Sequence, residues 1–114
     1  MAKFLFVYRS SAEAEMGEAP SPEQMQQIMT AWHGWFEKVG DALVDGGDGL
    51  LPTGKQVKSG GIVTDGPFIE AKEMVGGYSI VETDDIDGAV ELSKSCPIFD
   101  GGGWVEVRQL AELG

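Results

Sequence analysis

The sequence predicts an α+β fold that forms one domain over residues 1–114. A run of β-branched and aromatic residues opens the chain, a long apolar stripe at helical spacing follows it, and an alternating segment closes it. Of the 114 residues, 42% are hydrophobic and 24% are charged, which is the composition of an ordinary folded domain. A domain of this size buries enough apolar surface to fold without a disulfide or a structural metal.

The first two elements are a strand and a long helix. Lys3–Tyr8 is apolar or aromatic at nearly every position, which predicts a strand covered on both faces, and the small, acidic segment Ser10–Pro20 predicts a loop. Ser21–Gln24 predicts a helix start, because serine caps the helix, proline suits the first turn and glutamine completes a capping box. We expect this helix to run to about Val44, where the glycines and aspartates of Asp45–Gly49 end it.

The long helix carries a wide apolar stripe, which predicts that one of its faces packs on a sheet. The apolar residues recur at spacings of three and four: Met25, Ile28, Met29, Trp32, Trp35, Phe36, Val39 and Leu43. His33, the only histidine in the chain, lies at the flank of this stripe, where it could open onto a pocket at the edge of the helix–sheet interface.

The middle of the chain predicts a hairpin and a second strand. Gly54–Asp65 is typical of a hairpin, with Ser59–Gly61 as its turn. Glu73–Thr83 predicts a strand, in which the pair Gly76–Gly77 marks a bulge or a bend.

A second helix and a last strand complete the order. Thr83–Asp85 predicts the cap of a helix through Leu92 that Lys94 and Pro97 close, and Trp104–Leu110 alternates as a strand. The order strand, helix, hairpin, strand, helix, strand is the split β-α-β, ferredoxin-like arrangement with an inserted hairpin. Such a sheet carries helices on one face only, so we expect a second copy to cover the other face in a homodimer.

The net charge of −11 excludes several classes of partner. Eight basic residues against 19 acidic ones leave no basic face for nucleic acid, and the same balance disfavours an anionic membrane surface. We expect no signal peptide and no membrane span, because the apolar run that opens the chain is too short, and we predict a cytoplasmic protein. We predict no metal and no cofactor, because one histidine, Cys96 and scattered carboxylates show no ligand spacing.

Two short motifs are similar to known binding loops but lack an essential residue. Gly49–Gln56 has the glycine and lysine spacing of a phosphate-binding loop, but Gln56 cannot supply the hydroxyl that Mg²⁺ requires. Thr83–Lys94 is superficially similar to a Ca²⁺ loop, but its twelfth position is Lys94 instead of a bidentate acid. We therefore predict neither nucleotide nor calcium binding at these segments.

Asp65 is the second polar candidate beside His33. The run Asp65–Phe68 predicts a tight turn after a strand end, because Pro67 restricts the preceding glycine and Phe68 can anchor the turn. An acid fixed in such a turn could orient an imidazole or hold a substrate group. Alternatively, Asp65 only binds backbone amides of its own turn, and His33 is a partly exposed histidine without a chemical role.

The central run of the chain resembles a family signature. Val63–Glu73 resembles the signature of the DGPF branch of the YCII-related proteins, and the similarity continues through Gly76–Tyr78, Glu82–Asp85, Cys96–Pro97 and Gly102–Arg108. The resemblance covers essentially the whole chain. It implies a ferredoxin-like fold that dimerises through its sheet into an α+β barrel, with a cleft in each subunit and a mostly undefined activity.

The same resemblance implies a catalytic pair. In the wider YCII superfamily a histidine on the first helix and an aspartate are interpreted as such a pair, and some members act as dehydrochlorinases or lyase-like enzymes on small ring compounds. His33 and Asp65 are the residues that match. The resemblance also implies an association of some relatives with sigma-factor-linked transcription control.

Three functions remain open on the sequence. The first is proton transfer on a small molecule, with His33 as general base, Asp65 orienting it, and Arg9 or Lys72 holding an anionic group. The second is a non-catalytic ligand-binding or regulatory dimer. Its apolar cleft would be lined by residues of several elements, namely Trp32, Phe68, Gly76, Gly77 and Tyr78. The third is an oligomeric scaffold without a ligand.

Overall fold

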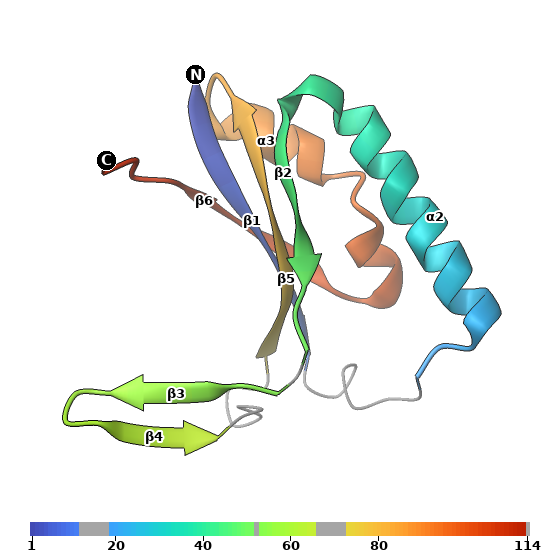
Figure 1. Cartoon of the computed structure of the whole chain (residues 1–114). Coiled ribbons are helices and arrows are strands. Elements are labelled where there is room, and N and C mark those ends of the chain that lie inside the picture. The colour runs from blue at the N-terminus through green and yellow to red at the C-terminus, as the bar shows by residue number, and fades with distance from the viewer. Residues whose placement is uncertain (12–18, 52, 66–72, 114) are drawn as a thin grey trace.

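Four antiparallel strands form the main sheet, and both helices lie on the same face of it (Figure 1). The computed structural model describes residues 1–11, 19–51, 53–65 and 73–113. The elements in chain order are β1 (Ala2–Ser11), α2 (Pro22–Val39), the 3₁₀ turn η1 (Gly40–Ala42), β2 (Leu43–Gly49), β3 (Lys55–Lys58), β4 (Ile62–Asp65), β5 (Glu73–Thr83), α3 (Ile86–Ser93), the 3₁₀ helix η3 (Pro97–Gly101) and β6 (Trp104–Gln109). The strand order β2-β5-β1-β6 with two helices is the ferredoxin-like α+β arrangement, so the predicted fold class is confirmed.

The central strand β1 shows which face of the sheet is covered. Phe4, Phe6 and Tyr8 point toward the helices and are buried, whereas Leu5 and Val7 on the opposite face are half-buried. In a single chain the second face is therefore only partly covered, and its predicted cover by a second copy stays a prediction. The strand also continues two residues into the segment predicted as a loop, and the loop's residues 12–18 lie outside the described part of the chain.

Helix α2 begins as predicted but ends earlier. The Ser21 hydroxyl accepts a hydrogen bond from the Gln24 amide at 3.1 Å, and the Ser21 amide donates to Gln24 Oε1 at 2.9 Å, which completes the capping box. The helix ends at Val39 instead of Val44, because Gly40 adopts a φ of 62° and turns the chain out of the helix.

The segment that was predicted to end the helix is the edge strand β2. Its register against β5 breaks twice, between Leu43 and Asp45 and between Asp45 and Asp48. Gly47 has a φ of 68°, and a Cβ there would lie 1.8 Å from the Tyr78 carbonyl oxygen. The aspartates and glycines that resemble a helix stop therefore also suit an irregular edge strand, which apolar periodicity does not reveal.

Only the C-terminal half of α2 packs onto the sheet. Trp35 and Val39 are buried, but Met25, Ile28 and Met29 are 44%, 44% and 53% exposed. Figure 1 shows α2 leaning away from the sheet toward its N-terminal end, and the orange-red segment after α3, which contains η3, lies beside that half. Because η3 occupies this space, the predicted apolar stripe reaches the sheet only at its C-terminal end.

The predicted hairpin is confirmed as a separate two-stranded sheet, β3–β4, that extends from the main sheet (Figure 1). Its turn uses Gly60 and Gly61, whose φ angles are 86° and 77°. All eight strand residues are exposed. Val57 and Val63 lie opposite each other and are 73% and 53% exposed. In a single chain, the hairpin therefore presents an apolar pair to solvent.

The remaining predicted elements are also confirmed. In β5 the predicted bulge lies at Gly76, because pairing with β1 steps from Gly77 directly to Val75. Helix α3 is capped by Asp85, whose carboxylate accepts a hydrogen bond from the Gly88 amide at 2.9 Å. Strand β6 ends one residue before its predicted end.

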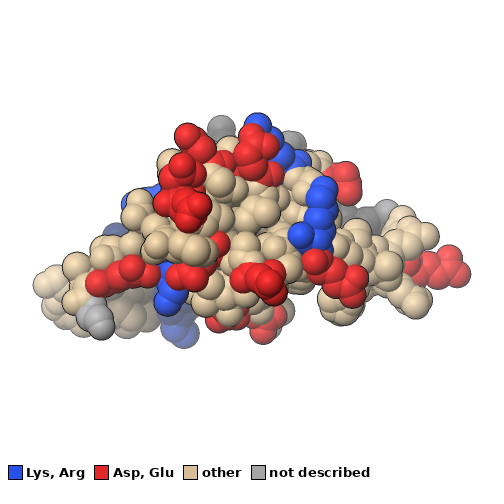
Figure 2. Space-filling view, turned by 90° about the horizontal axis from the view of Figure 1, so that it is seen from above, with Lys and Arg blue, Asp and Glu red and all other residues tan. Residues whose placement is uncertain are grey.

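The negative charge is spread over the surface. Figure 2 shows acidic side chains at many places on one face, with fewer basic side chains between them. Asp84, Asp85 and Asp87 at the start of α3 are exposed, as are Asp45 and Asp48 on β2. In the described part of the chain, no helix is long and apolar enough to cross a membrane.

Candidate functional site

The two residues predicted as a catalytic pair lie in different parts of the chain. His33 is exposed on α2. Asp65 ends β4, and its Oδ1 accepts a hydrogen bond from Lys55 Nζ at 2.6 Å in an exposed ion pair. Between these two described residues the structure shows no hydrogen bond and no ion pair, and Figure 1 shows the hairpin well apart from α2. Within one chain Asp65 therefore does not orient His33.

The residues predicted to bind substrate are divided between the two faces of the sheet. Arg9 Nη1 forms an ion pair with Glu106 Oε1 at 3.1 Å on the face without helices, and Tyr78 lies on this face opposite Val7. Trp32 lies on the helix-bearing side. The other two predicted residues, Phe68 and Lys72, lie outside the described residues. The structure thus does not gather Arg9, Tyr78 and Trp32 into one cleft.

Trp32 belongs to an aromatic cluster between α2 and β1. Its ring centroid lies 4.8 Å from that of Tyr8 in an edge-to-face contact, and 5.8 and 5.9 Å from those of Trp35 and Phe36. These contacts fix the indole at the boundary between the packed and the exposed half of the helix. The sequence predicts the apolar stripe, but it does not predict that Trp32 lies at the boundary between its packed and its exposed part.

A buried chain of hydroxyl groups lies beneath this cluster. The Tyr8 hydroxyl donates to Ser79 Oγ at 2.7 Å, and Ser79 Oγ donates to the Gly46 carbonyl oxygen at 2.7 Å. Burial raises the pKa of the Tyr8 phenol well above its ordinary value. The phenol is therefore neutral near pH 7 and joins β1, β5 and β2, which is a structural role.

A groove opens between the N-terminal half of α2 and η3. Its volume is about 590 Å³, within the range of small-molecule sites. Apolar side chains and proline rings form most of its surface, and two glutamines and one acid supply polar groups: Pro20, Gln24, Gln27, Ile28, Ala31, Trp32, Pro97, Ile98, Asp100 and Gly101. Because its walls come from two separate elements and are mostly apolar, we take this groove as the candidate site.

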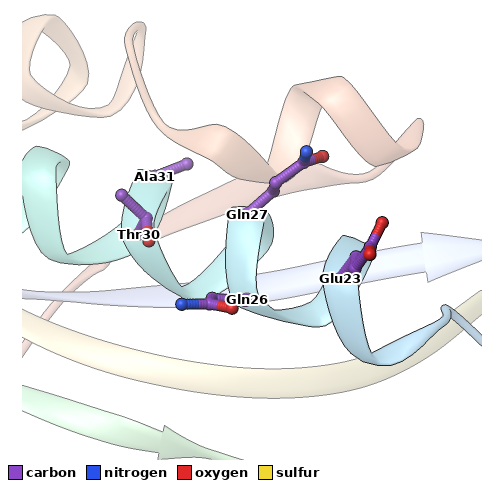
Figure 3. Close-up of a pocket in the computed structure, with 5 residues that line it drawn as sticks. All are labelled: Glu23, Gln26, Gln27, Thr30 and Ala31. Carbon is purple, nitrogen blue, oxygen red and sulfur yellow. The ribbon is translucent and has the colours of Figure 1, made fainter.

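A neighbouring hollow on α2 is less well formed. It has a volume of about 560 Å³, and its five lining residues, shown in Figure 3, are Glu23, Gln26, Gln27, Thr30 and Ala31. All five come from α2, so no second element supplies a wall. Gln27 and Ala31 also line the groove, whereas Glu23, Gln26 and Thr30 line this hollow alone.

A third hollow, of about 410 Å³, lies between the C-terminal half of α2 and the segment that runs from the end of α3 into η3, and it shares Ala31, Pro97 and Asp100 with the groove. Lys38 and Lys94 are at its rim, but Lys94 Nζ is paired with Glu91 at 2.6 Å. Cys96 is buried beside it, and burial raises the pKa of its thiol to about 11. A thiol that is protonated near neutral pH is a poor nucleophile, so this hollow offers no reactive group at Cys96.

Comparison with known proteins gives the family. In the described residues no group of three or more histidine, cysteine, aspartate or glutamate side chains could hold a metal ion. A comparison with curated proteins finds no match to this chain. The profile of the YCII-related domain matches residues 18–113, which include both helices, the hairpin and three of the four main strands. The chain therefore belongs to the YCII-related domain family.

Proposed function

We propose that this protein binds a small organic molecule in the groove between α2 and η3. The observation that carries the proposal is the groove itself, which has about 590 Å³ of space between two elements and mostly apolar walls. Ile28, which lines it, is 44% exposed although it belongs to the apolar stripe. A ligand would remove this apolar surface from water, which stabilises the complex by about 25 cal/mol for each Å² buried.

Binding without acid–base chemistry fits these residues better than proton transfer does. Of the sequence-predicted site residues, Trp32 lines the groove, whereas His33 and Asp65 lie apart from it and from each other. Proton transfer by His33 and Asp65 would need the two residues to come from two different copies. It stays a prediction, as does a link to transcription control.

A homodimer is the second part of the proposal. The face of the sheet opposite the helices carries half-buried apolar residues, among them Leu5, Val7, Tyr78 and Ile80. A two-fold interface would cover this face on both copies at once. Size-exclusion chromatography with light scattering tests it: we expect twice the 12.2 kDa of one chain, and a mass of one chain would contradict the dimer.

Thermal denaturation with small aromatic compounds tests the binding site. A compound at 100 times its dissociation constant adds about 2.7 kcal/mol to the free energy of unfolding, which raises the melting temperature measurably. Ala31→Trp places a large side chain in the groove from an exposed helix position, so it should abolish that shift. Thr30→Trp is the matched control, because Thr30 is exposed on the same helix but does not line the groove.

The two variants also separate binding from folding. Both should keep the far-ultraviolet circular dichroism of the parent chain, because neither position belongs to the buried core. An equal shift in Ala31→Trp and Thr30→Trp would contradict the assignment of the ligand to this groove.

A further inference from the structure

We infer that the ligand of this groove is an organic ammonium ion, with an apolar body of aromatic-ring size and a protonated amine. This inference rests on the proposed function, because it names the ligand class of the same groove. Three features of the described residues support it: the sign of the charge at the groove, the aromatic wall and the charge of the whole chain.

The charge of the groove is negative. Of the described residues that line it, Asp100 alone carries a formal charge. Asp100 is exposed on η3 and, like most described acids, forms no ion pair with any described residue. Its carboxylate can therefore accept a charge-assisted hydrogen bond from a ligand ammonium.

The charge of Asp100 affects the pKa of a neighbouring side chain. Burial is the main cause that raises the pKa of the Cys96 thiol, and the Asp100 carboxylate adds to it. Cys96 does not line the groove, but the same Asp100 carboxylate does, and there it would repel an anionic ligand by the same like-charge interaction. A carboxylate or phosphate ligand would meet no basic side chain among the described lining residues.

The aromatic wall also favours a cation. Trp32 lines the groove, and its contacts with Tyr8 and Trp35 hold the indole in place. An indole attracts an ammonium group through its quadrupole more strongly than any other aromatic side chain does. Gln27 adds an amide oxygen that can accept a hydrogen bond from an N–H group. The apolar Ile28 and Ile98 then accommodate the rest of the ligand.

The charge of the whole chain acts in the same direction. A net charge of −11 raises the local concentration of cations near the protein and repels anions, an effect that salt screens. Figure 2 shows acidic side chains at many places on one face, with fewer basic side chains between them. Long-range attraction and the contact at Asp100 therefore select the same sign of ligand charge.

Isothermal titration with three probes of similar size and different charge tests the inference. The probes are 2-phenylethylamine, 2-phenylethanol and phenylacetate. We expect the amine to bind about tenfold more tightly than the alcohol, the effect of one charge-assisted hydrogen bond, and phenylacetate to bind most weakly. Raising the salt concentration from low to physiological should weaken the binding of the amine and leave the binding of the alcohol nearly unchanged.

Two isosteric variants locate the selectivity. Asp100→Asn should weaken amine binding about three- to tenfold and leave alcohol binding unchanged, because one charged contact is lost. Asp84→Asn is the matched control: it removes the same charge from another exposed position and should change amine binding less than about twofold. Circular dichroism of both variants verifies that they are folded.

The outcomes separate this inference from the proposed function. Equal binding of amine and alcohol would overturn the ammonium ligand and leave groove binding standing. A preference for phenylacetate would overturn it as well. An amine preference that survives Asp100→Asn would overturn the role of Asp100. No binding of any probe, in a folded protein, would overturn both the ligand class and the proposed function.

Discussion

The two halves of α2 carry the same apolar pattern and have different surroundings. In the C-terminal half, Trp35 and Val39 are buried, and Trp35 Nε1 donates to the Leu92 carbonyl oxygen at 3.1 Å. In the N-terminal half, Ile28 and Met29 are 44% and 53% exposed. The difference arises because η3, and not the sheet, lies beside the N-terminal half. Helical periodicity therefore predicts which side of a helix is apolar, but not what that side meets along its length.

The largest effect should come from truncation in the packed half. Trp35→Ala should lower the free energy of unfolding by about 3–5 kcal/mol, because it removes a buried indole and leaves a cavity. Urea denaturation followed by circular dichroism measures the change. A loss below about 1 kcal/mol would show that this half is not the anchor of the helix.

The packed side of the molecule should also be the part that is sensitive to alkaline pH. Burial raises the pKa of Cys96 from 9.0 to about 11, so above pH 9 the unfolded chain loses this proton while the native chain keeps it. The free energy of unfolding should therefore fall as pH rises from 9 to 11.

The variant Cys96→Ala isolates this contribution. It should lose less stability between pH 9 and 11 than the parent chain, whatever its stability at pH 7. Tyr8 shifts in the same direction but is present in both proteins, so it cancels in the comparison. Parallel pH profiles would contradict the burial of this thiol.

A smaller and opposite effect is expected at the junction of the two halves. Gly34 lies in the helix, and no atom lies within 4 Å of the position that a Cβ would take. Gly34→Ala should therefore raise the free energy of unfolding by about 0.5–1 kcal/mol, because alanine loses less backbone entropy in a helix. A lower free energy of unfolding for Gly34→Ala, measured by chemical denaturation, would indicate that a Cβ does not fit at this position.

The smallest effect on stability should come from the half that borders the groove. Ile28→Ala should change the free energy of unfolding by less than about 1 kcal/mol, because the side chain is already 44% exposed and alanine favours helix. The same variant should weaken binding of 2-phenylethylamine, because it removes part of the apolar wall. If Ile28→Ala lowered the free energy of unfolding as much as Trp35→Ala does, the two halves of the helix would not differ in packing.

Most of the fold could be predicted from local sequence chemistry. The serine–proline–glutamine start of α2, the glycine turn of the hairpin and the Gly76 bulge each have a direct physical cause within a few residues. Strand β2 could not be predicted, because an edge strand of aspartate and glycine lacks apolar alternation. Its pairing with β5 depends on residues 28 to 38 positions away.

The candidate site was less predictable than the fold. Among the predicted site residues that the structure describes, only Trp32 lines the groove. The 3₁₀ helix η3, which supplies Ile98 and Asp100, was not predicted. Pro97 after Cys96 was the available signal, since proline suits the first turn of a helix as well as the end of the previous one. Which residues face each other across a groove depends on tertiary packing and is not contained in local patterns.

Amide chemical-shift mapping tests the central claim most directly. The protein is labelled with ¹⁵N and titrated with 2-phenylethylamine, and the perturbed amides are placed on the structure. We predict that the largest shifts occur at Ile28, Trp32, Ile98 and Gly101, and that Val57 in the hairpin stays unchanged. Shifts confined to the hairpin or to the face of the sheet without helices would contradict a binding site between α2 and η3.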